Sequence, residues 1–184
     1  MTRGALHRAE EYGRQTGAMP HRIDPPYLAD ERAMLVSWLV YHRDTLRLKC
    51  EGLTDEQLRV RSVPPSTLSL LGLVRHCADV ERSWWRRTME RQTVAGLFYD
   101  DAHPDGEFDD VEDASVAEAF AAWEAECAHG DEVLAAHPSL DDVGHRKGED
   151  ISLRWVLVHL IEEYARHNGH ADLLRERIDG ATGE

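Results

Sequence analysis

The sequence predicts an all-α protein, a bundle of four long amphipathic helices. Three observations support this fold class. Apolar residues recur at helical spacing in four separate segments, no segment shows the strict alternation of a half-buried strand, and proline or glycine lies in the connections between the segments. With 184 residues, the chain has the size of a single domain that can bury a sizeable core.

The N-terminal residues differ from the rest of the chain. Residues 1–24 have no apolar periodicity and are expected to form a flexible extension, with Met19 as an alternative start of the gene product. The helical bundle is expected over residues 25–180. Its first helix follows Pro25-Pro26 and carries apolar residues at helical spacing up to Gly52, where a glycine typically ends a helix.

The other three helices are separated by polar segments. They are expected at residues 68–93, 115–137 and 152–179. A long acidic loop, residues 95–113, joins the second helix to the third and holds eight Asp and Glu residues. Pro138 ends the third helix, because the residue before a proline avoids helical backbone angles. Residues 141–150 are expected to be a polar loop.

Composition excludes several classes of partner. The chain has 21 Lys and Arg against 35 Asp and Glu, a net charge of −14, whereas surfaces that bind nucleic acid or anionic membranes need a basic face. No apolar run approaches the roughly 20 residues of a membrane span. The three cysteines are widely spaced and form no disulfide framework. We therefore expect a reduced, cytoplasmic protein with no nucleic-acid or membrane partner.

The fourth helix places a carboxylate and a histidine on its apolar face. At about 100° per residue, Leu160, Leu174 and Glu163 all lie within about 40° of His167. An unpaired carboxylate on a buried face costs on the order of 2–7 kcal/mol or more. A divalent metal would remove this cost, since two ligands four residues apart on one helix converge on a common point. Alternatively, Glu163 is half-exposed and pairs with Arg166 or His167, or His167 is a core histidine bonded to a carbonyl.

Two motifs give the chain a family resemblance. Residues 71–85, LGLVRHCADVERSWW, look like the second helix of the DinB/YfiT-like superfamily. Residues 163–170, EYARHNGH, resemble the fourth-helix signature of that superfamily, a His-x-x-x-His pair followed by Arg-Gly-Gln. The chain has Glu163 in place of the first histidine, as in the branch similar to mycothiol-dependent maleylpyruvate isomerase. The resemblance covers about residues 25–180.

The resemblance implies a fold, a site and an activity. The fold is an antiparallel four-helix bundle, in many members a homodimer, and the ligands of a divalent metal, zinc or nickel, are His76, Glu163 and His167. The implied activity is the transfer of a low-molecular-weight thiol, mycothiol or bacillithiol, to an electrophile. His170 or His159 would then move the proton. Arg75 or Arg166 would bind polar groups of the thiol, although surface ion pairs are the favoured alternative for both arginines. The alternative is a non-catalytic, stress-related bundle that binds a metal or another ligand.

Overall fold

The computed structural model describes residues 22–183, so most of the expected N-terminal extension lies outside the described residues. Within that range the chain forms six α-helices, one π-helix and a small hairpin. In chain order they are α2 (Glu31–Cys50), α3 (Asp55–Arg59), α4 (Leu70–Arg82), η1 (Ser83–Met89), α5 (Gly106–Asp109), α6 (Val116–Ala136), β1 (Val143–Arg146), β2 (Glu149–Ser152) and α7 (Leu153–Asp179).

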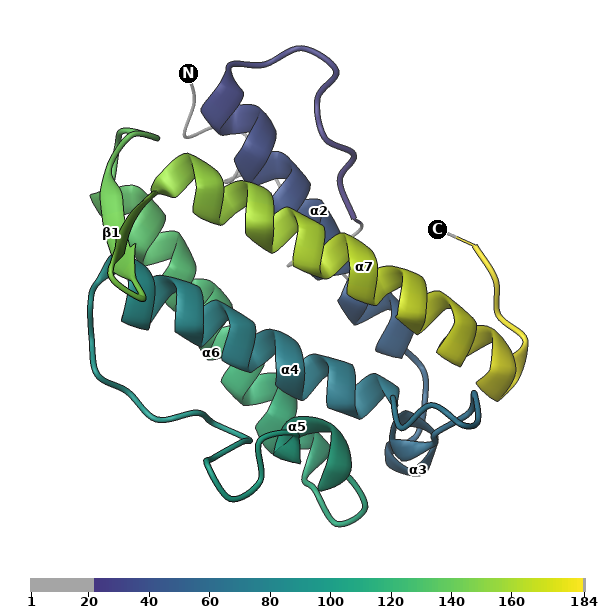
Figure 1. The fold of residues 1–184 in the computed structure, drawn as a ribbon. Helices are drawn as coiled ribbons and strands as arrows, with labels where there is room; N and C mark the ends of the chain where they lie inside the picture. Colours follow the sequence, from purple (N-terminus) through teal and green to yellow (C-terminus); the bar gives the residue numbers. More distant parts are fainter. Residues whose placement is uncertain (1–21, 184) are drawn as a thin grey trace.

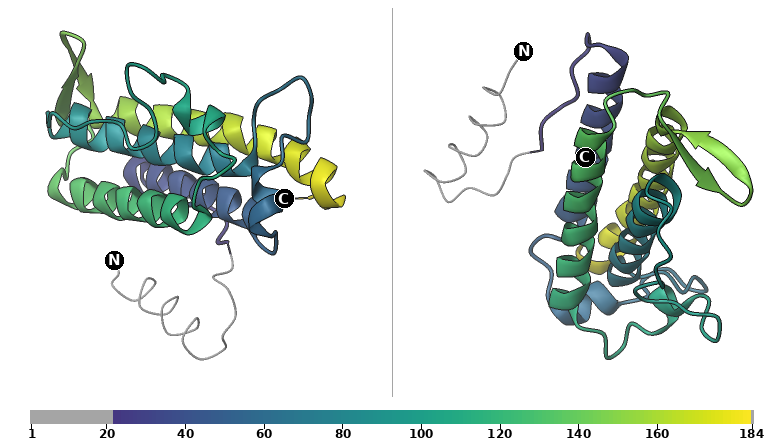
Figure 2. Two further views of the ribbon diagram at one scale, coloured as in Figure 1. Left: turned by 90° about the horizontal axis from the view of Figure 1, so that it is seen from below. Right: turned by 90° about the vertical axis from the view of Figure 1, so that its left-hand side faces the viewer.

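The four long helices form the predicted bundle (Figure 1). The most extensive contacts join α2 to α7 and α4 to α6, and α4 also packs on α7. The left-hand view of Figure 2 shows the hairpin at one end of the bundle, and α5 packs against α4. None of the helices within residues 22–183 is long and apolar enough to cross a lipid bilayer.

Side-chain caps fix where the long helices begin. The residue before each long helix accepts a hydrogen bond from a backbone N–H of the first helical turn; these residues are Asp30, Ser69, Ser115 and Ser152. The bond satisfies a donor that the helix itself leaves unpaired. The second long helix therefore begins at Leu70, two residues later than its apolar pattern predicts. At the other end of α7, Gly180 takes the left-handed backbone conformation with φ of 78° and ends the helix.

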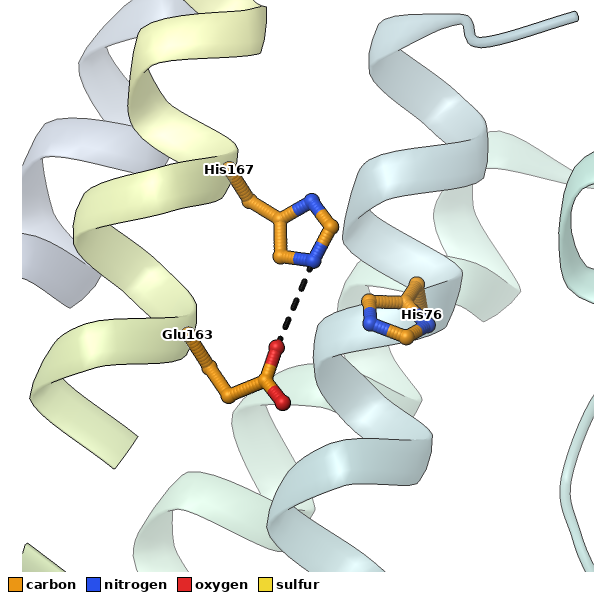
Figure 3. A group of neighbouring side chains, drawn as sticks. All are labelled: His76, Glu163 and His167. Carbon is orange, nitrogen blue, oxygen red and sulfur yellow. Dashed lines mark ion pairs between the residues drawn. The ribbon is translucent and has the colours of Figure 1, made fainter. Parts of the chain in front are cut away.

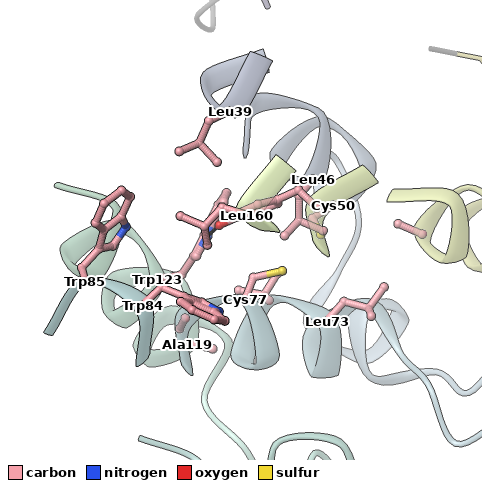
Figure 4. Close-up of a cluster of buried hydrophobic side chains, with 14 of the residues drawn as sticks. Leu39, Leu46, Cys50, Leu73, Cys77, Trp84, Trp85, Ala119, Trp123 and Leu160 are labelled. Carbon is pink, nitrogen blue, oxygen red and sulfur yellow. Dashed lines mark hydrogen bonds between the residues drawn. The ribbon is translucent and has the colours of Figure 1, made fainter. Parts of the chain in front are cut away.

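Leucine and tryptophan side chains from all four long helices fill the core (Figure 4). The largest fully buried side chains are Trp85, Trp123, Tyr164, Leu39, Leu46, Leu70, Leu71, Leu73, Leu153, Leu157, Leu160 and Leu174. Cys77 is buried on α4 and Cys50 at the end of α2, whereas Cys127 is half-buried. All three thiols are free, as the sequence predicts.

A buried carboxylate, Glu81, joins the helices at the centre of this core. Its two oxygens accept hydrogen bonds from Arg43 at 2.7 and 2.8 Å, from Tyr164 at 2.8 Å and from Trp85 at 2.5 Å. The Tyr164 hydroxyl in turn accepts a hydrogen bond from Trp123 at 2.7 Å. A buried charge is tolerated only with such partners. Because the partners come from α2, η1, α6 and α7, the network holds these helices at one register relative to α4.

The structure corrects the expectation of a polar loop at residues 141–150. This segment contains the antiparallel β1–β2 hairpin, whose turn residues Lys147 and Gly148 have φ of 51° and 88°. Two positive φ values at the turn are typical of a tight hairpin. The strands have four residues each, which is too short for an alternating pattern to stand out.

The second helix and the acidic loop also differ from expectation. The helix does not continue to residue 93, because it widens into η1 and ends at Met89. The acidic loop is not wholly irregular, since Gly106–Asp109 form the short helix α5. Phe108 of α5 packs against the core, which explains why part of this acidic segment is ordered beside α4.

Candidate metal centre

Three of the predicted site residues meet between α4 and α7 (Figure 3). His76 projects from α4, and Glu163 and His167 project from α7. One ligand atom from each lies within 4.8 Å of the other two. Glu163 Oε2 lies 3.4 Å from His167 Nε2, and the His76 and His167 rings are 4.6 Å apart between centroids. Donor atoms this close can share one divalent ion.

The helices dictate this geometry. The side chains of Glu163 and His167 are four residues apart and lie one above the other on the same face of α7. That face contacts α4, where His76 completes the group. The three side chains are partly buried, with exposed fractions of 22% for His76, 23% for Glu163 and 12% for His167. The group is thus held by packed helices but is still open to solvent.

The electrostatics of the cluster suit a cation. Hydrogen bonding to His167 is the main cause that lowers the pKa of Glu163, so this side chain stays a carboxylate. Burial, followed by the neighbouring His167, lowers the pKa of His76, so its imidazole is neutral at neutral pH. Metal ligands must be deprotonated, and metal binding competes with protons. Glu163 and His76 therefore have the protonation states that a divalent ion requires.

A glutamate from the acidic segment supports His76. Glu107 Oε1 lies 3.3 Å from Nδ1 of His76, and the Phe108 ring stacks on the imidazole with centroids 5.0 Å apart. Gly72 lies one turn before His76, and a Cβ atom there would meet Phe108 at 3.1 Å. The absence of a side chain at Gly72 therefore lets α5 approach α4. Sequence reasoning missed Glu107; the only signal is Gly106 and Phe108 within an otherwise acidic run.

The two histidines predicted to move protons occupy different places. His159 Nε2 lies 3.2 Å from Glu163 Oε1, and its ring stacks on Trp155 with centroids 5.0 Å apart. The Nδ1 atom of His170 lies 3.4 Å from Nδ1 of His167, and burial lowers the pKa of His170. His159 therefore contacts the carboxylate of the cluster, whereas His170 contacts the other side of the His167 ring.

A cavity of about 260 Å³ opens beside the cluster. Its walls include His76, Glu163 and Glu107 together with His159, Trp84 and Arg146. Neither arginine that the sequence suggests for ligand binding is in this wall. Arg75 donates a hydrogen bond to the carbonyl of Asp110 and faces another hollow, and Arg166 pairs with Glu162 on the surface.

Helical bundle and site together define a class of protein: a four-helix bundle in which two histidines and one carboxylate form a candidate metal site beside an open cavity. The family model for mycothiol S-transferase matches residues 34–180, well over half of the chain. The chain belongs to this family, a branch of the DinB/YfiT-like superfamily of metal-dependent proteins. Comparison with curated proteins gave no match. The family assignment confirms the resemblance and implies mycothiol and an electrophile as substrates.

Proposed function

We propose that this protein joins mycothiol to an electrophilic carbon in a reaction that depends on a divalent metal held by His76, Glu163 and His167. The single observation that carries the proposal is the convergence of these three side chains beside an open cavity, in a chain of the mycothiol S-transferase family. Three protein ligands leave coordination positions for a substrate, as in catalytic zinc sites. Imidazole ligands suit zinc or nickel, and zinc also binds carboxylate oxygens.

Thiol activation is the chemistry that such an ion supplies when bound. A free thiol has a pKa near 8.5 and is mostly protonated at neutral pH, whereas the thiolate is the nucleophile. A thiol coordinated to a divalent cation is deprotonated. Glu163 would contribute the one negative charge among the three protein ligands, so a bound divalent ion would keep a net charge of about +1, which suits one thiolate.

Proton transfer falls to the histidines of the cavity. His159 lines the cavity and contacts Glu163, which supports a role for its imidazole in accepting the thiol proton and releasing it to solvent. His170 is the second candidate for moving the proton, and it contacts the ring of His167. The protein itself needs no nucleophile, and none of its cysteines lines the cavity.

The non-catalytic alternative predicts a different environment for the cluster. A metal that only stabilises a fold is enclosed by protein ligands, whereas a catalytic metal keeps an open position. His76 and Glu163 line a cavity and are about one-fifth exposed, which favours the enzyme.

The experiment is a conjugation assay. Zinc- or nickel-loaded protein is mixed with mycothiol and monobromobimane, and with bacillithiol in parallel. We expect conjugation above the uncatalysed rate, loss of this rate after chelation and recovery on adding the metal back. Conjugation no faster than the uncatalysed rate with every thiol and metal would favour the non-catalytic alternative.

A homodimer is part of the proposal because the family resemblance implies it. Light scattering of the purified chain tests this point directly, and a mass of one chain would refute it.

A further inference from the structure

An arginine from the hairpin is fixed in the cavity wall. Arg146 Nη1 donates hydrogen bonds to Ser83 Oγ at 2.9 Å and to Thr88 Oγ1 at 3.2 Å. Its guanidinium carbon lies 4.3 Å from the centroid of the Trp84 ring, in a cation–π contact. The hairpin packs closely on η1: a Cβ atom at Gly144 would lie only 2.4 Å from the Thr88 carbonyl oxygen, so there is no room for a side chain there. Arg146 therefore has a defined position rather than a mobile surface one.

The charge of Arg146 is not balanced by a carboxylate. Within residues 22–183, no Asp or Glu oxygen lies within 4.0 Å of its guanidinium, and both of its hydrogen-bond partners are neutral hydroxyls. The nearby Arg87 adds a second positive charge, and it too donates to neutral acceptors, the Tyr99 hydroxyl and the Val94 carbonyl. Burial and the charge of Arg87 lower the pKa of Arg146. An anion bound there would offset both effects, because its negative charge favours the charged guanidinium.

The carboxylates of the same cavity are engaged elsewhere. Asp79 accepts the backbone N–H groups of Leu97 and Phe98 at 2.7 and 3.0 Å. Glu107 faces His76, and Glu163 lies between the histidines of α7. The cavity thus has two sides: the proposed metal ligands with their acidic neighbours, and an unpaired guanidinium beside an aromatic ring.

We infer that Arg146 binds an anionic group, a carboxylate, of the electrophilic substrate, so that the protein selects anionic electrophiles. This inference rests on the proposed function. Mycothiol carries no carboxylate, so the anion belongs to the electrophile. The guanidinium can bind a carboxylate through paired N–H donors, which fixes the orientation of the substrate as well as its charge. The bound electrophile then presents its reactive carbon to the thiolate on the opposite side of the cavity.

Two matched electrophiles test the inference with mycothiol held constant. They are 4-chloro-3,5-dinitrobenzoate, which is anionic, and its neutral methyl ester. In both reactions a sulfur–carbon bond forms, the carbon–chlorine bond breaks, chloride leaves and the thiol proton is released. For each variant, kcat/KM is divided by the uncatalysed rate constant of the same electrophile, which removes differences in intrinsic reactivity.

The variants are Arg146→Gln, Arg146→Lys and, as a control outside the cavity, Arg47→Gln on α2. Loss of a charge-assisted hydrogen bond predicts that Arg146→Gln lowers the corrected kcat/KM for the benzoate about 10- to 100-fold. The value for the ester should change by less than about threefold, which also shows that the variant is folded. Arg146→Lys should retain part of the preference, and Arg47→Gln all of it.

Binding of unreactive 3,5-dinitrobenzoate, followed by calorimetry without thiol, provides a readout independent of turnover. Wild-type protein should bind it, and Arg146→Gln should bind it at least tenfold more weakly. Equal effects of Arg146→Gln on benzoate and ester, or none on either, would overturn the inference while the proposed function stands. If the wild-type protein conjugates neither of these electrophiles nor monobromobimane, the proposed function fails, and the calorimetry alone decides whether Arg146 binds carboxylates.

Discussion

Glu107 lies 3.3 Å from Nδ1 of His76, so the acidic segment between the second and third long helices reaches the candidate metal centre. A carboxylate on one imidazole nitrogen fixes the tautomer and orientation of the ring and leaves the other nitrogen for a metal. Glu107 is only 7% exposed, and its second oxygen has no hydrogen-bond partner among the described residues. Burying a carboxylate costs free energy. The contact with His76 is the interaction that accounts for a glutamate at this buried position.

The first prediction concerns this contact. Glu107→Gln should weaken the affinity of the site for zinc about 10- to 100-fold, the usual effect of changing a group that orients a metal ligand. Competition titration of metal-free protein with a chromophoric chelator measures the change. Glu112→Gln, in an exposed position of the same segment, is the matched control and should bind zinc like the wild type. Equal affinities for the two variants would contradict the role of Glu107.

Sequence periodicity is sufficient to predict the two site residues that lie on one long helix. Glu163 and His167 are on one face of α7 because of their spacing alone, whereas the choice of His76 as their partner came from the family resemblance. Glu107 and Arg146 escaped prediction because both lie on short elements, α5 and β1, whose sequences have no long periodic pattern. Their positions depend on tertiary contacts, such as Phe108 packing beside Gly72 and Gly144 packing on Thr88.

The same contrast applies to the fold. The four long helices follow from their apolar stripes, and their ends shift by only a few residues where Ser69 supplies the cap or η1 widens the helix. The Glu81 network could not be derived from periodicity, because it joins four helices through polar side chains on buried faces. A pattern of apolar residues does not show which polar side chain finds a partner.

The second prediction tests the Glu81 network. Tyr164→Phe removes a hydroxyl that donates to Glu81 and accepts from Trp123, and it leaves both groups buried with one partner fewer. The free energy of unfolding should fall by about 1–3 kcal/mol. Urea denaturation followed by circular dichroism measures the loss. Tyr27→Phe, at a fully exposed tyrosine, is the control, and a Tyr164→Phe variant as stable as this control would refute the network's contribution.

The third prediction is that the thiols of the protein take no part in the reaction. Burial raises the pKa of Cys50 to about 12 and raises the pKa values of Cys77 and Cys127 as well. Native protein treated with iodoacetamide at pH 7.5, followed by removal of the reagent, should retain its conjugation rate. Mass spectrometry should show alkylation of all three cysteines only after denaturation. Rapid native alkylation with loss of the rate would instead indicate a cysteine nucleophile.

The fourth prediction concerns pH and His42. Burial, and then the charge of Arg22, lower the pKa of His42 below its ordinary value near 6.5. Below this pH the unfolded chain binds a proton that the folded protein does not. The contribution of His42 to the free energy of unfolding is therefore complete above about pH 6.5 and is lost as the pH falls through the lowered pKa. The Nδ1 atom of His42 also lies 3.4 Å from the Asn168 amide nitrogen, a contact that suits the neutral ring.

Melting temperatures of metal-free protein between pH 7.5 and 5.5 measure this effect. The wild type should lose stability over this interval, and His42→Asn should lose less. Lowered pKa values of His76 and His170 act in the same direction, so the variant removes only part of the loss. His103→Asn, in an exposed position, provides the control. A pH dependence of His42→Asn identical to that of the control would contradict the prediction.

The central claim is that His76, Glu163 and His167 form one metal site, and the most direct measurement is zinc binding by their variants. Calorimetric titration of metal-free protein should give one ion per chain. His76→Ala and His167→Ala should each lower the affinity at least tenfold, and Glu163→Gln should weaken it by removing the one anionic ligand, whereas His145→Ala, an exposed histidine of β1, should change nothing. Full zinc affinity in both His76→Ala and His167→Ala would contradict the account.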